Sequence, residues 1–360
     1  MAERRLENEL KIRGLNLGGW LVSERWMTPL LYQSFGVEDE SSLVELLPHA
    51  AAKDLFTTHR KTFITEKDFA FIAERGFNSL RLPIPWYVFG QQGPDPKKNI
   101  GCIEYVDFCM EQAHKHGLSV LLDLHTVPGG QNGFDNSSYL NQIEWHLDDD
   151  NRIVSLTVLS LLAKRYKDNP ALFGIELMNE PKLAGFKGLR FTQGIPAHYL
   201  RNFYRAAYKL LREDLDSDKA IVIHDAFEPA MWKGFMSSQD YENVWLDLHR
   251  YHCFGPEVET IHKGRNLHLE IKKDSKAIKT AAKGNKKVMI GEWSGALAIP
   301  QNEMTPEGRK AFERVFIRRQ LKEFAKADAW YFWSYKLEND MAAWDARKAL
   351  AFLEKDVLCS

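Results

Sequence analysis

The chain has 360 residues, 44% of them hydrophobic, and a formal net charge of −1. This size and composition allow a large buried core, while the near-neutral charge gives no global field that would attract nucleic acid or an anionic membrane. No run approaches the roughly 18 to 20 apolar residues of a membrane span, so none is predicted.

Short β-type runs alternate with amphipathic helical runs along the whole chain. One helix begins with a capping arrangement, Thr65 with Asp68 three residues later, and glycines 76 and 117 end two of the helices. In chain order the predicted elements are strand Ile12–Leu17, helix Thr65–Arg75, strand Ser79–Leu82, helix Ile103–His116, strand Ser119–Leu124, helix Asn151–Lys167, strand Phe173–Met178, helix Pro196–Glu213, strands Ala220–His224 and Val244–Leu248, helix Leu267–Lys283, strand Val288–Glu292, helix Glu307–Lys326 and strand Ala329–Trp333.

Eight strands that alternate with helices predict an α/β fold, and eight parallel strands close a single (β/α)8 TIM barrel. No linker or repeat divides the sequence, so residues 1–360 are expected to form one catalytic domain. In such a barrel, catalytic groups lie at the carboxyl ends of the strands and in the loops that follow them. Every predicted strand brings polar or aromatic candidates to that position: Asn16, Glu24, Arg81, His125, Asn179, Glu180, His224, Asp225, His249, Tyr251, Glu292 and Trp333.

Two glutamates are the strongest functional signal. Glu180 and Glu292 each end an apolar run, in Leu-Met-Asn-Glu-Pro and in Ile-Gly-Glu-Trp-Ser, and a barrel would bring the two together although 112 residues separate them. Cleaving a glycosidic bond needs such a pair, one acid to protonate the leaving oxygen and one carboxylate as nucleophile or base. Two surface glutamates at strand ends are the alternative.

The N-terminus and the cysteines bear on location. Residues 1–8 are charged and lack the apolar segment of a signal peptide. The sequence thus predicts a cytoplasmic protein if Met1 is native, and a secreted one if a signal peptide has been removed. Cys102 and Cys109 lie seven apart in a predicted helix, a rise of roughly 10 Å that exceeds the reach of a disulfide. The cysteine usage therefore favours a reduced, intracellular protein.

Several runs in order along the chain resemble glycoside hydrolase family 5, in particular its branch of exo-β-1,3-glucanases, the glucan 1,3-β-glucosidases. The Gln-Asn-Gly-Phe-Asp-Asn and His-Asp-Ala-Phe runs are the most specific to the branch. The matching runs are Gly14–Trp20, Leu80–Pro85, Asp123–His125, Gln131–Asn136, Leu177–Pro181, Ile223–Phe227, Gly291–Ser294 and Phe332–Lys336.

The resemblance implies a retaining enzyme that needs no metal, with Glu180 as acid/base and Glu292 as nucleophile. It also implies that Glu24 grips the terminal glucose and closes the site beyond it. The residues that it implies around the sugar are Arg81, His125, Asn179, His249, Tyr251 and Trp333. The chain departs from the branch at residues 296–307, where an insertion is shortened, and at residues 341–360, which lack the usual Asn-Gly-Leu ending. Chain-length preference and linkage are therefore less firmly implied than the chemistry.

Physical roles follow for the individual groups. Glu180 needs a raised pKa to act as an acid. Arg81 lies in an apolar strand and needs a carboxylate partner, for which Glu292 is the candidate and another acid the alternative. Asn179 is expected to bond the sugar 2-hydroxyl, and Tyr251 to orient Glu292. A cap on the following turn is the structural alternative for Asn179, and a purely structural role is the alternative for Tyr251.

The aromatic and histidine candidates also have structural alternatives. Trp333 is either a floor for the glucose ring or barrel packing, and His125 and His249 are either sugar contacts or structural residues. Phe134 and Phe254 form an entrance for the next sugar or pack within their loops. A zinc site that uses histidines after the strands is disfavoured, because the chain has no His-Glu-x-x-His.

The sequence therefore predicts a retaining hydrolase of β-glucosidic bonds, most simply an exo-β-1,3-glucanase that releases glucose from non-reducing ends through a covalent glucosyl-enzyme. Within catalysis, the alternatives are a β-glucosidase of β-1,6-linked, short-oligosaccharide, lipid or sterol glucosides, and transglycosylation as the main activity. A non-catalytic carbohydrate-binding barrel is the alternative of a different class. The expected partner is a β-glucan or β-glucoside substrate, with no cofactor and no nucleic acid, and the chain is expected to be a monomer.

Overall fold

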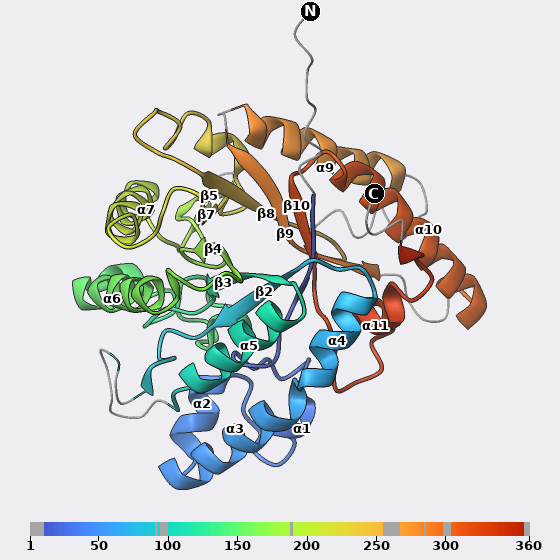
Figure 1. The fold of residues 1–360 in the computed structure, drawn as a ribbon, viewed down its shortest axis with the longest axis horizontal. Coiled ribbons are helices and arrows are strands. Elements are labelled where there is room, and N and C mark those ends of the chain that lie inside the picture. Colours follow the sequence, from blue (N-terminus) through green and yellow to red (C-terminus); the bar gives the residue numbers. More distant parts are fainter. Residues whose placement is uncertain are drawn as a thin grey trace, which may run out of the picture.

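The computed structural model describes residues 11–90, 93, 100–187, 190–254, 267–283, 286–297 and 304–355, and they form a closed eight-stranded parallel barrel surrounded by helices (Figure 1). The neighbouring strands around the barrel are β1, β10, β9, β8, β7, β4, β3 and β2, and β1 pairs with both β10 and β2 to close it. The predicted (β/α)8 fold is confirmed.

All eight predicted strands are present, with some differences at their ends. β4 ends at Glu176, two residues earlier than predicted, while β8 and β9 continue well beyond the predicted ends. The barrel strands are β1 Ile12–Asn16, β2 Ser79–Ile84, β3 Ser119–Leu124, β4 Leu172–Glu176, β7 Ala220–His224, β8 Val244–His252, β9 Lys287–Leu297 and β10 Ala329–Phe332.

The six predicted helices are also present, within two residues at each end. The capping box of Thr65 and Asp68 is formed, with each side chain bonded to the other residue's backbone amide. These helices are α4 Glu66–Glu74, α5 Ile103–Lys115, α6 Asp149–Tyr166, α7 Ala197–Leu211, α9 Leu267–Ala282 and α10 Pro306–Phe324. None of the helices in the described ranges combines the length and apolarity needed to cross a bilayer.

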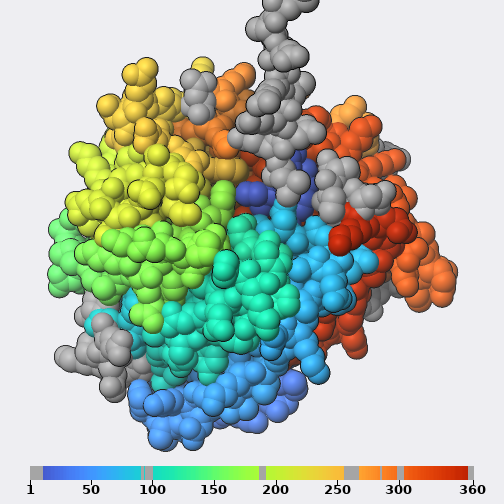
Figure 2. Space-filling view, viewed as in Figure 1, coloured from blue at the N-terminus to red at the C-terminus, as the bar shows by residue number. Residues whose placement is uncertain are grey.

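The sequence analysis missed the elements that lie between the barrel units. Of the four helices between β1 and β2, only α4 was predicted, and the other three are α1 Pro29–Tyr32, α2 Glu40–Leu46 and α3 His49–Phe63. They form their own small core around Leu31, Leu43 and Phe56, and together make the blue layer at one edge of the molecule (Figures 1 and 2). A hairpin, β5 Gly185–Lys187 and β6 Arg190–Thr192, follows β4, and a short helix, α11 Ala346–Ala349, follows β10.

Cys102, Cys109 and Cys253 are free thiols, whereas Cys359 lies outside the described residues. The Cys102 and Cys109 side chains are both buried in the main core of the protein.

The barrel interior divides into an apolar layer and a polar layer. Strand side chains alternate between the two faces of a sheet, so residues two apart point the same way. On β8, for example, Trp245 belongs to a small apolar cluster inside the barrel, and Asp247 and His249 follow it at the polar level. The other buried members of that cluster are Leu121, Ala220, Val222, Met289, Ala329 and Tyr331. This apolar layer supports the polar groups above it.

Gly14 offers a test of the apolar layer. A Cβ at this position would lie 2.2 Å from the Tyr331 ring and 2.9 Å from the backbone oxygen of Ser79. Because the neighbours are a packed ring and backbone, Gly14→Ala should lower the free energy of unfolding by about 1–3 kcal/mol, the usual effect of overpacking. Gly185→Ala is the matched control, since its Cβ would meet nothing within 4 Å. Urea unfolding of the two variants gives the comparison, and equal stabilities would contradict the packing described here.

Candidate active site

A single arginine, Arg81 of β2, lies at the centre of the polar layer and is fully buried. Its Nε donates to Glu176 (2.8 Å), its Nη1 to Glu292 (2.9 Å) and its Nη2 to Asn179 (2.8 Å). Nη2 also lies 3.1 Å from an Asp123 oxygen. The guanidinium therefore fixes side chains from β3, from β4 and the residues after it, and from β9. The predicted partner Glu292 is one of three carboxylates within 3.1 Å.

Glu292 lies within β9 rather than at its end, and donors hold both of its oxygens. Arg81 contacts Oε1, and the Tyr251 hydroxyl donates to Oε2 over 2.8 Å. Burial raises the pKa of Glu292 above its ordinary value, and the nearby carboxylate of Glu180 adds to this rise. The carboxylate is thus fixed in position but carries its charge less readily than a solvated glutamate does.

Glu180 lies four residues beyond the end of β4, in an unusual backbone conformation. Its φ is +43°, in the left-handed region that residues with a Cβ rarely adopt. Neighbouring backbone bonds hold the turn: the Asn179 amide donates to Leu124, and the Gln131 side chain donates to the Asn179 carbonyl. A conformation with such strain, of order 1–3 kcal/mol, persists only where the surrounding structure holds it in place. In this turn the conformation directs the Glu180 side chain toward His249.

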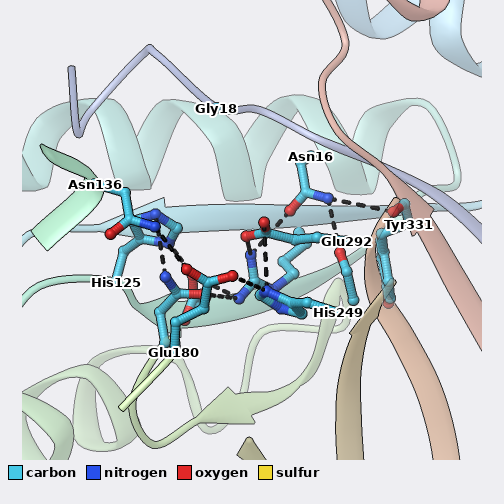
Figure 3. Close-up of polar contacts among 12 residues, drawn as sticks. Asn16, Gly18, His125, Asn136, Glu180, His249, Glu292 and Tyr331 are labelled. Atoms are coloured by element: carbon cyan, nitrogen blue, oxygen red, sulfur yellow. Dashed lines mark hydrogen bonds and ion pairs between the residues drawn. The ribbon is translucent and has the colours of Figure 1, made fainter. Parts of the chain in front are cut away.

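The two glutamates converge on one imidazole, that of His249. Its Nδ1 lies 2.7 Å from Glu180 Oε1 and 3.4 Å from Glu292 Oε2. Figure 3 shows the two carboxylates directed toward one another, with contacts from Glu180 to both Asn136 and His249. The 2.7 and 3.4 Å contacts keep Glu180 Oε1 and Glu292 Oε2 closer together than the roughly 6.5 Å at which the carboxyl separation of inverting glycosidases begins. This limit on one pair of oxygens is compatible with the shorter spacing of a retaining pair.

The predicted rise in the pKa of Glu180 is wrong for the free site. Burial does oppose its charge, but hydrogen bonds from His249 and Asn136 outweigh it and lower the pKa to about 2. Burial likewise opposes a charge on His249, yet Glu292, Asp247 and Glu180 around it raise the pKa of His249 well above its usual value. In the free site, therefore, the proton of the Glu180–His249 pair resides on the imidazole.

Asp247 holds the other nitrogen of His249, and a glycine makes room for it. Asp247 Oδ2 lies 3.2 Å from His249 Nε2, and Oδ1 accepts the backbone amide of Gly291 over 2.5 Å. Although burial opposes its charge, His249 and Arg81 lower the pKa of Asp247 to about 2. A Cβ on Gly291 would lie 1.9 Å from Asp247 Oδ2, so the carboxylate occupies the space that any side chain at 291 would need.

Glu24 is buried in the segment between β1 and α1, where the Trp26 indole donates to its Oε2 over 2.8 Å. Burial raises the pKa of Glu24 well above its ordinary value, with Asp135, Glu292 and Glu180 adding to the rise. The predicted sugar ligand therefore shares an electrostatic environment with both catalytic candidates.

His125, Asn179 and Trp333 form a connected group after β3, β4 and β10. The His125 ring lies parallel to Trp333, with centroids 5.6 Å apart and planes 8° apart, and its Nδ1 contacts Asp123 over 2.6 Å. The Asn179 oxygen is taken by Arg81, and its amide nitrogen lies 3.4 Å from His125 Nε2. The Asn179 amide is thereby oriented with its donor away from Arg81.

Phe134 and Phe254 do not join this polar network. Both rings are exposed, 44% and 62% respectively. Phe254 meets Tyr251 edge-on at 5.6 Å and tilts against Trp344 at 5.9 Å, while the Lys182 ammonium lies 6.0 Å from the Phe134 ring. Their exposure fits the predicted entrance role better than the predicted loop packing.

The sequence analysis missed four polar partners of the site. Asn136 donates to Glu180 over 2.7 Å, and Asp123, Glu176 and Asp247 surround Arg81 and the two histidines. The three acids each interrupt an apolar strand, as in Leu-Leu-Asp-Leu, Gly-Ile-Glu-Leu and Trp-Leu-Asp-Leu. That is the same pattern that singled out Arg81, and it could have identified them.

Two trios of potential metal ligands lie in the described site, Glu180 with His224 and His249, and Glu176 with Asp247 and His249. Both depend on His249, whose raised pKa favours the imidazolium, a form with no lone pair for a metal. The expectation of a metal-free reaction stays a prediction.

Comparisons with known proteins show which sequences and folds this chain resembles. A model of the cellulase family, glycosyl hydrolase family 5, matches residues 49–338. A probable glucan 1,3-beta-glucosidase A of Emericella nidulans is 33% identical over 95% of this chain and 89% of its own length. The sporulation-specific glucan 1,3-beta-glucosidase of Saccharomyces cerevisiae is 33% identical over 94% of this chain and 84% of its own.

Solved structures share the fold at lower identity. A rutinosidase from Aspergillus niger superposes with a TM-score of 0.77 at 20% identity, covering 95% of this chain and 94% of that one. The endoglucanase Cel5A of Thermotoga maritima gives a TM-score of 0.59 at 18% identity, covering 97% and 96%. These structures show the shared fold. The family match and the two glucan 1,3-beta-glucosidase relatives show that the chain belongs to glycosyl hydrolase family 5, whose members are retaining glycosidases, and that it is a glycoside hydrolase.

Proposed function

We propose that this hydrolase is an exo-β-1,3-glucanase that releases glucose from the non-reducing ends of β-glucans, with Glu292 as nucleophile and Glu180 as acid/base. One observation carries the residue roles: a single imidazole contacts both carboxylates, at 2.7 and 3.4 Å. The substrate follows from relatives named glucan 1,3-beta-glucosidases that align over nearly the whole chain. The enzyme is also proposed to act as a monomer.

In the first step, Glu292 attacks the anomeric carbon while Glu180 protonates the leaving oxygen. Arg81 and Tyr251 fix the two oxygens of Glu292, so that one stays bound while the other attacks. The proton reaches Glu180 Oε1 from His249 Nδ1 across their 2.7 Å contact, leaving a neutral imidazole. The products of this step are a glucosyl ester on Glu292 and the shortened glucan.

In the second step, Glu180 acts as a base. Esterification removes the negative charge of Glu292, and with it the repulsion that favours a proton on one of the two acids. Glu180 then accepts a proton from the water that attacks the ester, and glucose leaves with its original β configuration. Glu24, held by Trp26, is proposed to grip the terminal glucose and to block the site beyond it.

The leaving-group dependence should separate the two roles. Glu180→Gln should lose about 10²–10⁴-fold in turnover on laminaribiose, the usual contribution of general acid catalysis. On an activated aryl β-glucoside, whose leaving group needs no proton, its kcat/KM should fall far less, because kcat/KM reports the first step. Its kcat on that substrate should still fall, because the second step needs Glu180 as a base. Glu292→Gln should fail on both substrates. Steady-state kinetics on the two substrates makes the test, with Glu270→Gln, another poorly exposed glutamate, as control. Normal turnover of laminaribiose by both site variants would overturn the assignment.

The substrate assignment predicts the product and its anomer. Laminari-oligosaccharides should release glucose one unit at a time, and proton NMR of the first minutes should show the β-anomer before mutarotation. Gentiobiose and an aryl β-glucoside should be poorer substrates by kcat/KM than laminaribiose. A higher kcat/KM on gentiobiose, or internal cleavage of laminarin, would replace the β-1,3 exo assignment.

The pKa directions predict a bell-shaped pH dependence of kcat/KM. Because the pKa of Glu292 is raised, its nucleophilic form should be lost as the pH falls through a value above the ordinary glutamate pKa of about 4.3. Because the pKa of His249 is raised, the proton it shares with Glu180 should be lost only above about pH 6.5. Rate measurements on an unactivated substrate test both limbs. An acid limb at or below about 4.3, or an alkaline limb below about 6.5, would contradict the charge states.

A further inference from the structure

We propose that Asp274, on helix α9, is a positioning residue for the reaction, because it fixes the strand segment that aims Tyr251 at Glu292. Asp274 does not touch the site. It contacts the residues on both sides of Tyr251 in the sequence, Arg250 and His252. The inference rests on the proposed role of Glu292 as nucleophile.

The contact between Asp274 and the strand has the geometry of a clamp. Asp274 is fully buried, and its Oδ1 accepts both Nε and Nη2 of Arg250 at 2.7 Å. Its Oδ2 lies 2.9 Å from Nε2 of His252, whose ring also meets Phe316 edge-on. A carboxylate that accepts from two side chains spaced two residues apart fixes both the position and the twist of the strand between them.

The alternation of a strand explains how this clamp acts on Tyr251. Side chains at 250 and 252 point to one face of β8, and the side chain at 251 points to the other. Asp274 therefore holds the outer face of the strand against α9, which packs beside β8 and β9 (Figure 1). On the inner face, the Tyr251 hydroxyl donates to Glu292 Oε2.

This part of β8 needs an external support. Pairing of β8 with its other neighbour, β7, ends at the match of His224 with Asp247, so the last residues of β8 pair with β9 alone. The β8–β9 register shifts between Leu248 and His249, and again between Arg250 and His252. With one partner strand and an irregular ladder, backbone pairing alone does not fix the direction of Tyr251. Its ring packs against Phe254 and Trp344, and the Asp274 clamp adds a constraint on the strand that carries it.

A double-mutant cycle between Asp274→Asn and Tyr251→Phe tests the inference. Tyr251→Phe should lower kcat/KM by about 10–100-fold, the size expected for a lost hydrogen bond to a charged group. Asp274→Asn can accept from only one of its two partners and should lower kcat/KM by about tenfold, mainly through kcat. The double variant should be no worse than Tyr251→Phe within about twofold, because the clamp acts through that hydroxyl.

The pH profile gives a second readout that a general loss of stability would not move. The groups that act on Glu292 are Arg81, His249, Glu180, His125, Glu24 and Tyr251. The tyrosine hydroxyl favours the ionised carboxylate by donating to it. Both Tyr251→Phe and Asp274→Asn should therefore shift the acid limb of kcat/KM to higher pH. His252→Phe, which removes one arm of the clamp, should shift it in the same direction by a smaller amount.

Asp107→Asn is the matched control. Asp107 also pairs with an arginine and a second donor, Arg165 and Tyr166, but it joins α5 to α6 on the outside of the barrel. Its loss should leave kcat/KM and the acid limb unchanged.

The outcomes separate this inference from the proposed function. If folded Asp274→Asn keeps wild-type kcat/KM and acid limb, or if its loss multiplies that of Tyr251→Phe, the clamp is wrong while the roles of Glu180 and Glu292 stand. If Glu292→Gln and Tyr251→Phe both keep wild-type turnover, the proposed function itself fails. If Asp274→Asn does not fold, His252→Phe decides, and an unmoved acid limb in that variant overturns the inference.

Discussion

The buried guanidinium of Arg81 is the constraint on which the rest of the site depends. Removing a cation from water is unfavourable by several kcal/mol unless opposite charge and hydrogen bonds replace the lost solvation. The barrel supplies more acid than one cation balances, namely Asp123, Glu176 and Glu292. The excess charge makes these acids easier to protonate: burial raises the pKa of Glu176 well above its ordinary value, and that of Glu292 is raised as well. The same side chains therefore determine both the stability of the polar layer and the charge state of the nucleophile.

His249 plays the complementary part, since it is the second buried cation of the layer. It links Asp247 on one side to Glu180 and Glu292 on the other. A cation between two acids keeps them close without requiring both to be neutral. His249 also carries a proton that lies one hydrogen bond away from Glu180, the group that donates it in the reaction. Reaction chemistry and electrostatic balance thus depend on the same imidazole, which explains why Asp247 is buried behind it with a strongly lowered pKa.

The strands and many of the site residues could be predicted from local sequence pattern. The charge states and backbone conformations of the site depend on distances that only the fold sets. Eight apolar runs identified the strands, and residues that interrupt or end them, such as Arg81 and Glu292, identified the site. Three of the four helices between β1 and β2 were missed, because the pattern sought was one strand followed by one helix, and α1 to α3 are additional to it. The pKa of Glu180 could not be predicted, because its direction follows from the 2.7 Å contact with His249, a residue 69 positions away. The left-handed backbone of Glu180 was equally invisible, since no glycine marks it.

Gly291 shows how far the polar layer limits change in the chain. The space where its side chain would stand holds the Asp247 carboxylate, and that carboxylate is committed to the Gly291 amide and to His249. Position 291 is therefore expected to remain glycine as long as residue 247 remains aspartate. A lineage that gained a methyl group at 291 would have to shorten residue 247 in the same step, and would then lose the counter-ion of the imidazole. The two positions are expected to be inherited as a unit.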